Sequence, residues 1–500
     1  MLGCRPLLRG PWVVSDLPAL SRRATHRRRL TAASLVTALV VTIAAAGPAT
    51  ATPPVPDSGL LPAAGEPGAP EATEQRNMCT RGRPVADSLQ RPLAQRIMNF
   101  ERVWPLTRGA GQIVAVIDTG VNPHPRLPRL TPGGDYVATD DGTVDCDAHG
   151  TLVAGLIAAQ PVAGSGFAGG APDVEVIAIR QSSRNYSDRS AGDEAAAQNS
   201  PGYGDVRTLA SAVRHAADLG ATVINISEVA CTLAVDGIAD GPLGAAVQYA
   251  TDVEDAVVVA AAGNKDVCRA GNPPAANPLD PQADPWDSIT TIASPAWYDD
   301  YVLTVGWVEA DGTPSDESVP GPWVDVAAPG NGIVSLDPFS DGLIDAQVGA
   351  QGPVPLSGTS FSAPLVSATV ALVRARHPHL DARAVMDRIE STAHAPAEGW
   401  NPRVGHGVID PLAAVTAPLP VEQDHPAAPR AIAGPAHVEP PDPTARLVAW
   451  SGGAAVLVLL VAALLAALPF RERARRRRHA SNTHSPAPIG PGRGSGATPS

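Results

Sequence analysis

Short apolar runs alternate with longer segments of helical spacing along residues 90–410 of this 500-residue chain. The apolar runs predict buried strands at Gln112–Ile117, Val174–Ile179, Thr222–Ile226, Ala256–Ala262, Tyr301–Val305 and Val324–Ala327. The longer segments predict helices at Leu152–Ala159, Arg207–Leu219, Leu243–Val253, Thr359–Arg376 and Asp381–Ser391. Strands that are apolar throughout and separated by helices are typical of an α/β fold, with a mainly parallel sheet covered on both faces. Residues 181–205, rich in Ser, Asn, Gly and Ala, predict an insertion loop.

The N-terminal region has the order of a secretory signal. Arginines between residues 22 and 29 precede the apolar stretch Ala32–Ala46, and Ala49–Ala51 is a small-residue cleavage site. We therefore predict a signal peptide over residues 1–51, with an uncleaved anchor helix as the alternative.

A second apolar segment lies near the C-terminus. Leu447–Phe470 is uncharged and long enough to cross a bilayer as a helix. The arginine-rich tail, residues 471–500, follows at once, and the positive-inside rule places it in the cytoplasm. We therefore predict a single-pass protein of the cell membrane, with the body on the extracytoplasmic side. Residues 411–446, rich in proline, predict a linker between body and membrane.

Charge and composition exclude some functions. The formal net charge is −13 and the arginines concentrate at both ends, so the intervening body is strongly acidic. Phosphate contacts need clustered Arg or Lys, so no nucleic-acid partner is expected. No acidic loop has the spacing of Ca²⁺ ligands, and neither a metal nor a cofactor is expected.

The cysteines agree with export. Cys4 would leave with the signal peptide, and four cysteines remain: Cys79, Cys146, Cys231 and Cys268. An even number in an exported chain predicts two disulfides, for which three pairings are possible.

Candidate catalytic residues lie where the predicted strands and helices begin or end, as expected for a parallel sheet. Asp118 closes the first strand, and Gly120 permits a tight turn after it. The Asp-Thr-Gly tripeptide occurs once, whereas an aspartic-protease mechanism needs two. His149 opens a buried helix in the sequence His-Gly-Thr, where Gly150 allows close backbone approach.

A serine and an asparagine complete the set. Ser360 lies in Ser-Gly-Thr-Ser-Phe-Ser-Ala-Pro, and we expect Pro364 in the first turn of the following helix. The backbone N–H of Ser360 would then face a developing oxyanion. Asn264 follows an apolar strand, and its side-chain amide can donate the second hydrogen bond of an oxyanion hole.

These elements together resemble the subtilase (subtilisin-like, peptidase S8) family over about residues 95–410, and they keep its chain order Asp, His, Ser. The resemblance implies a three-layer sandwich and a catalytic triad of Asp118, His149 and Ser360, in which His149 takes the serine proton. The chain departs from the family at Asn225–Ala230, where Glu-Val replaces the usual Leu-Gly after Asn-x-Ser.

The whole architecture is most similar to mycosins, membrane-anchored proteases of type VII secretion systems. In the implied sheet, the strands before Ser227 and Asn264 are neighbours, so Cys231 is expected to pair with Cys268. Cys79 would then pair with Cys146. Residues 52–90 are too few for a folded inhibitory domain, so we expect this N-terminal extension to wrap the peptidase domain, residues 91–410, and to remain attached.

Three functions fit these features. The first is a serine endopeptidase for limited processing of exported protein substrates of a type VII system, which also stabilises the membrane complex. The second is mainly a structural subunit of that complex, with secondary protease activity. The third, a degradative surface protease, is disfavoured by the short extension and the missing Leu-Gly pair.

Overall fold

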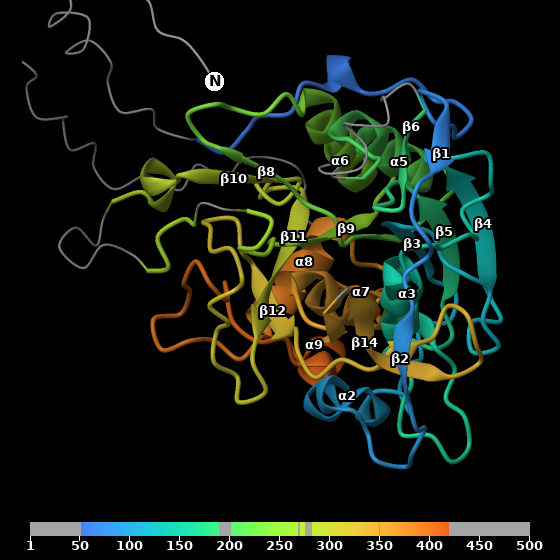
Figure 1. The fold of residues 1–500 in the computed structure, drawn as a ribbon. Helices are drawn as coiled ribbons and strands as arrows, with labels where there is room; N and C mark the ends of the chain where they lie inside the picture. Colours follow the sequence, from blue (N-terminus) through green and yellow to red (C-terminus); the bar gives the residue numbers. More distant parts are fainter. Residues whose placement is uncertain (1–51, 190–201, 269–270, 276–282, 350, 420–500) are drawn as a thin grey trace, which may run out of the picture. The chain divides into compact units, whose positions relative to one another are not determined.

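The computed structural model describes residues 52–189, 202–268, 271–275, 283–349 and 351–419 (Figure 1). The predicted signal peptide, the transmembrane segment and the basic tail all lie outside these residues. Within these ranges, no helix combines the length and the apolar character needed to span a bilayer.

The centre of the fold is a seven-stranded sheet whose strands all pair in parallel. In spatial order its strands are β12 (Val326–Pro329), β11 (Val302–Val308), β9 (Val257–Ala261), β7 (Val223–Ile226), β3 (Ile113–Asp118), β5 (Glu175–Arg180) and β4 (Leu130–Asp135). The predicted α/β class is therefore confirmed, and six of the seven strands fall on predicted apolar runs.

Two layers of helices cover the sheet (Figure 1). The bounds of the helices are α2 (Leu93–Met98), α3 (His149–Ala158), α5 (Val206–Asp218), α6 (Gly241–Asp252), α7 (Thr359–Arg376), α8 (Ala382–Ser391) and α9 (Pro411–Thr416). Helices α3 and α7 pack on one face, whereas α5 and α6 pack on the other. This arrangement gives the three layers that the sequence predicted.

The alternation of side chains along β3 separates two cores. Val114 and Val116 point into the core that contains α3 and α7, while Ala115 and Ile117 point into the core that contains α5 and α6. All four are fully buried. Successive side chains of a strand face opposite sides of the sheet, so a strand covered on both faces is apolar at every position.

The N-terminal extension adds short strands to the edges of the domain. Its β1 (Thr73–Gln75) pairs with β6 (Tyr186–Asp188), which lies inside the predicted insertion loop. Its β2 (Gly82–Val85) pairs with β14 (Leu343–Gly349), beside which Figure 1 shows it in blue. A short 3₁₀ helix, η1 (Ser58–Leu60), packs near α6. The extension therefore runs along the domain, as expected.

Smaller elements complete the structure. Strand β14 also pairs with β13 (Ser335–Leu336) and β15 (Gly352–Pro355), while β8 (Ala230–Leu233) pairs with β10 (Thr291–Ser294). Two further 3₁₀ helices are η2 (Phe100–Arg102) and η3 (Pro285–Ser288). The predicted disulfides Cys79–Cys146 and Cys231–Cys268 are both formed.

The structured domain continues beyond the boundary expected at residue 410. Asp410 caps α9 by accepting hydrogen bonds from the backbone N–H groups of Leu412 and Ala413. Ala414 of α9 is buried in the main core, and the buried Arg388 donates to its carbonyl oxygen. Pro411 thus begins a helix rather than a linker, because proline is well accommodated in the first turn.

The position of Pro364 also differs from the expectation. Helix α7 begins at Thr359, so Pro364 is its sixth residue and lies inside the helix. A proline there cannot donate to the carbonyl oxygen four residues earlier, which belongs to Ser360. The hydroxyl of Ser227 donates to that oxygen instead, at 2.9 Å. The carbonyl oxygen of Ser360 therefore accepts its hydrogen bond from a neighbouring segment instead of from the helix.

Candidate active site

Asp118 lies at the carboxyl end of β3 and is fully buried. Its Oδ1 accepts a hydrogen bond from the backbone N–H of Thr119 at 2.8 Å and contacts Nδ1 of His149 at 2.7 Å. Gly120 follows with φ +97°, and a Cβ atom there would lie 2.2 Å from the carbonyl oxygen of Val144. Only glycine fits this turn, which directs the carboxylate toward the imidazole.

His149 is the first residue of α3. Its Nε2 lies 2.9 Å from Oγ of Ser360, and its ring packs against Phe361 with centroids 5.3 Å apart. Because the carboxylate of Asp118 only accepts hydrogen bonds, Nδ1 carries the proton and Nε2 accepts from the serine hydroxyl. A Cβ on Gly150 would lie 2.1 Å from the carbonyl oxygen of Gly120, so this glycine lets α3 approach β3 closely.

Ser360 is the second residue of α7 and is 8% exposed. Its backbone N–H group lies in the first turn of the helix, where N–H groups have no acceptor within the helix. This group is therefore available to an oxyanion. The hydroxyl of Ser227 fixes the carbonyl side of the same residue. Asn225 in turn donates to Ser227 Oγ at 2.9 Å and accepts from Ser367 of α7 at 2.8 Å. Sequence reasoning missed this supporting role.

Asn264 is oriented by the residue before the serine. Its Oδ1 accepts from the backbone N–H of Thr359 at 3.0 Å and from the Thr359 hydroxyl at 3.1 Å. With the oxygen held there, Nδ2 points to the other side. A Cβ on Gly358, which has φ +139°, would lie 3.1 Å from Asn264 Nδ2 and 3.5 Å from Ser360 Oγ. The glycine therefore leaves open the space between the amide and the nucleophile.

A cleft exposes this edge of the sheet. It is lined by His149, Ser360 and Asn264 together with residues of five other segments, among them Thr80, Arg184, Glu228 and Gln347. Thr80 belongs to the N-terminal extension, which therefore forms part of the cleft wall.

The electrostatics of the cleft centre on His149. Burial lowers its pKa, but the charge and hydrogen bond of Asp118 raise it, and Glu228 adds to the rise. The net result is a pKa of about 9. Sequence reasoning noted the unusual Glu-Val pair at this position but did not place the Glu228 carboxylate beside the imidazole.

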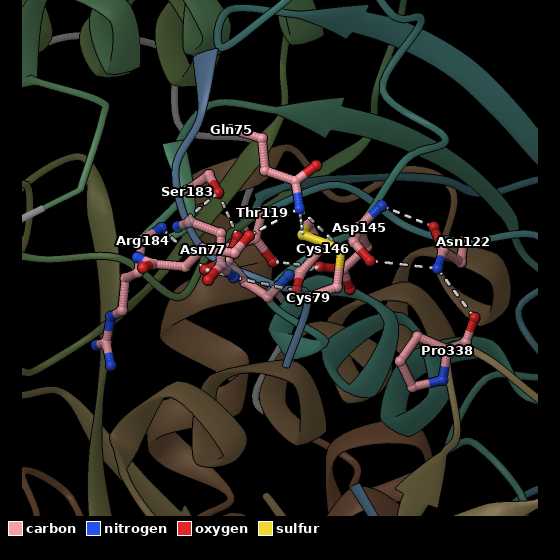
Figure 2. Close-up of a disulfide and its surroundings, with 12 residues drawn as sticks. Gln75, Asn77, Cys79, Thr119, Asn122, Asp145, Cys146, Ser183, Arg184 and Pro338 are labelled. Carbon is pink, nitrogen blue, oxygen red and sulfur yellow. Dashed lines mark hydrogen bonds between the residues drawn. A yellow bond between two sulfur atoms is a disulfide. The ribbon is translucent and has the colours of Figure 1, made fainter. Parts of the chain in front are cut away.

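A further buried carboxyl group, that of Asp145, lies next to the Cys79–Cys146 disulfide (Figure 2). Asp145 accepts hydrogen bonds from the hydroxyl groups of Thr119 and Thr151 at 2.9 and 2.7 Å. These two threonines belong to the segments that carry the aspartate and the histidine, so Asp145 ties them together. Burial raises the pKa of Asp145 to about 7, against the lowering effect of the Thr151 hydrogen bonds. The adjacent Cys146 bonds to Cys79.

The structure thus brings Asp118, His149 and Ser360 into one hydrogen-bonded chain, with Asn264 beside it. This is the constellation of a serine peptidase on a doubly covered parallel sheet. The subtilase family matches residues 109–407 of the chain. The chain therefore belongs to the subtilase family, whose members are serine peptidases.

Within this family the chain is similar to mycosins along most of its length. It is 50% identical to mycosin-4 of Mycobacterium tuberculosis (strain ATCC 25618 / H37Rv) over 432 residues, covering 83% of this chain and 90% of that relative. Identity to mycosin-3 of the same organism is 43% over 445 residues, covering 85% of this chain and 93% of that relative. The predicted resemblance is confirmed.

Solved structures give the same result. The crystal structure of MycP1 from Mycobacterium smegmatis superposes with a TM-score of 0.67 at 44% identity, covering 74% of this chain and 96% of that one. A chain of an intact ESX-5 inner membrane complex superposes with a TM-score of 0.69 at 43% identity, covering 83% of this chain and all of that one.

Proposed function

We propose that this protein is a serine endopeptidase that cleaves peptide bonds through an acyl-enzyme intermediate. The observation that supports this most strongly is the continuous contact Asp118–His149–Ser360, with heavy-atom distances of 2.7 and 2.9 Å. Nucleophile, base and orienting carboxylate are thus in the geometry that serine peptidases use.

Each residue has a role in the proposed reaction. Neutral His149 takes the hydroxyl proton through Nε2 while Ser360 Oγ attacks the peptide carbonyl carbon. The resulting oxyanion receives hydrogen bonds from the backbone N–H of Ser360 and from Nδ2 of Asn264. The imidazolium, stabilised by Asp118, then gives its proton to the leaving amine, and the acyl-enzyme forms. Water attacks the ester with His149 as base, which releases the acid and restores the serine.

We infer that the substrates are exported proteins of a type VII secretion system, cleaved at limited sites. MycP3, which is 43% identical, is described as the protease of the type VII (ESX-3) secretion system. A second role, stabilisation of the membrane complex, is favoured by the match to a chain of the periplasmic assembly of the ESX-5 inner membrane complex, at a TM-score of 0.69. Proteolysis would be secondary if that structural role dominates.

The proposed membrane topology follows from the sequence. The signal peptide would export the body, the helix at Leu447–Phe470 would anchor it in the cell membrane, and the arginine-rich tail would remain in the cytoplasm. The peptidase domain would then face the extracytoplasmic compartment. Two disulfides support this placement, because such bonds persist in oxidising compartments.

Fluorophosphonate labelling of the full-length chain, extracted in detergent, tests the enzymatic proposal. Wild type is expected to be labelled on Ser360, and the Ser360→Ala chain is not. A folded wild-type chain without label would contradict the acyl-enzyme mechanism. Secretion by cells that carry only Ser360→Ala then separates the two roles: loss of secretion supports processing, while retained secretion supports the structural subunit.

A further inference from the structure

Glu228 brings a second carboxylate to the catalytic imidazole. One oxygen of Glu228, one oxygen of Asp118 and one ring nitrogen of His149 all lie within 4.8 Å of one another. Glu228 lies two residues beyond β7 and lines the same cleft as Ser360. The mechanism above assigns no role to this residue.

Glu228 is held in place rather than free in solvent. Its side chain is half-buried, and its Oε1 accepts a hydrogen bond from the Ser182 hydroxyl at 3.0 Å. Arg184, which lies two residues after Ser182, lines the cleft and has an exposed side chain. Its backbone N–H donates to Asp147 at 2.8 Å, which fixes the segment that carries both Ser182 and Arg184.

Three charged side chains act on His149, each from a different segment. Asp118 comes from β3, Glu228 from the segment after β7, and Arg184 from the segment between β5 and β6. Ser360, from α7, is neutral. The two carboxylates favour the imidazolium, whereas the guanidinium of Arg184 opposes it. Two negative charges against one partly solvated positive charge leave a net preference for protonated His149.

We propose that Glu228 is a positioning residue of the general base, whose carboxylate stabilises protonated His149 and sets the pH above which the triad acts. The proposal rests on the triad mechanism given above. Since a general base must be neutral to accept a proton, a carboxylate that stabilises the charged form delays the onset of activity to higher pH. The same charge stabilises the imidazolium once it forms during acylation.

The titration behaviour supports this role. Burial lowers the pKa of His149, and the charges of Asp118 and Glu228 raise it, to about 9. Burial and the charge of Asp118 raise the pKa of Glu228, while His149, Ser182 and Arg184 lower it. Because Glu228 and His149 shift the pKa of each other, the acid limb of the activity profile is expected to respond to a change at Glu228.

The test is the rate of fluorophosphonate labelling of the full-length chain, measured between about pH 5 and about pH 10, a range that covers the His149 titration. In Glu228→Gln we expect the acid limb to move down by about one pH unit, the order of shift that one nearby charge produces. Labelling below the limb then becomes about tenfold faster than in wild type. The plateau at high pH does not rise. Glu228→Asp keeps the charge and is expected to keep the wild-type limb.

Controls separate the possible failures. Glu398→Gln changes an exposed carboxylate outside the cleft and is expected to leave the profile unchanged. Glu228→Leu provides a second neutral variant if Glu228→Gln does not fold. A wild type that is unlabelled at every pH would overturn the triad mechanism itself. If wild type is labelled but the acid limb does not move in the neutral variants, only the role of Glu228 is overturned. A loss of labelling rate that is equal at all pH values would overturn that role as well.

Discussion

Two regions of this molecule contribute to the same cleft but are held in place by different means. The catalytic edge (Asp118, His149, Asn264 and Ser360) sits at the ends of elements of the main core, and each side chain is fixed by hydrogen bonds from neighbouring segments. The N-terminal extension, residues 52–90, exposes several of its large apolar side chains, with Met78 91% and Leu89 79% exposed, and only Leu61 and Val85 are partly buried against the two cores. Its contacts with the domain include two short strands, the packing of η1 near α6, and one disulfide.

This comparison suggests a division of tasks. The catalytic edge depends on burial, which restricts its side chains to one geometry, so single substitutions there should affect rate far more than stability. The extension buries fewer apolar side chains than the main core, so its attachment should depend on the Cys79–Cys146 disulfide.

Ser360→Ala should break the catalytic edge completely while leaving the extension attached. We expect peptidase activity to fall by about 10⁴- to 10⁶-fold, because the nucleophile is lost. The unfolding temperature should change little, because Ser360 is the second residue of α7 and alanine is favourable in a helix. Hydrolysis of a fluorogenic peptide and a thermal melt measure the two effects. A variant with more than about one hundredth of wild-type activity would show that Ser360 is not the nucleophile.

Asn264→Ala should weaken the catalytic edge without abolishing it. Removing one oxyanion-hole donor costs about 10²–10³ in kcat, a magnitude that comes from subtilisin, a member of this family. KM should stay near the wild-type value, because this hydrogen bond forms in the transition state. Asn272→Ala is the matched control, since that buried asparagine binds backbone carbonyl groups outside the catalytic edge. An equal loss of kcat in the control would contradict the assigned role.

The catalytic edge was also the more predictable region. Asp118, His149, Asn264 and Ser360 all lie in short motifs next to strongly apolar segments, so local sequence alone indicates both the residue and its place in the fold. The extension strands β1 and β2 are only three and four residues long and read Thr-Glu-Gln and Gly-Arg-Pro-Val. Such segments become strands only because an exposed edge of another strand is available to pair with them.

The misses share a physical cause, which is dependence on partners distant in sequence. Strand β4 contains Pro132 and two glycines, which is not the pattern of a buried strand, and it forms at the edge of the sheet, where proline is tolerated. Pro364 lies inside α7 because Ser227 satisfies the carbonyl group that it leaves without a donor. Glu228 meets His149 only after the sheet has formed. None of these contacts is marked by a local pattern.

Removal of the Cys79–Cys146 disulfide should detach the extension without disabling the catalytic edge. The bond closes a loop with a sequence separation of 67 residues, and a loop of that length corresponds to about 4 kcal/mol of stabilisation in the chain-entropy description. In Cys79→Ser/Cys146→Ser we expect limited proteolysis to release residues 52–90 first. Fluorophosphonate labelling of Ser360 should persist in the trimmed protein.

The second disulfide provides the matched control for this experiment. Cys231→Ser/Cys268→Ser removes a bond of sequence separation 37 within the peptidase domain. It is expected to lower the unfolding temperature without faster cleavage of the extension. Equal cleavage of residues 52–90 in both double variants would mean that the strand pairing of β1 and β2, rather than the covalent link, holds the extension.

The smallest effect is expected at Ser227, which lies next to the catalytic edge and donates a hydrogen bond to the Ser360 carbonyl oxygen. Ser227→Ala removes the hydroxyl that donates to the Ser360 carbonyl oxygen and leaves that buried acceptor unpaired, at a cost of about 1–3 kcal/mol in unfolding free energy. Pro364→Ala restores an N–H to the helix at the position that can donate to the same oxygen. The destabilisation by Ser227→Ala should therefore be smaller in a Pro364→Ala background than in wild type. Chemical denaturation of the four proteins of this double-mutant cycle measures the coupling, and strictly additive losses would show that the Ser227 hydroxyl does not substitute for the missing N–H of Pro364.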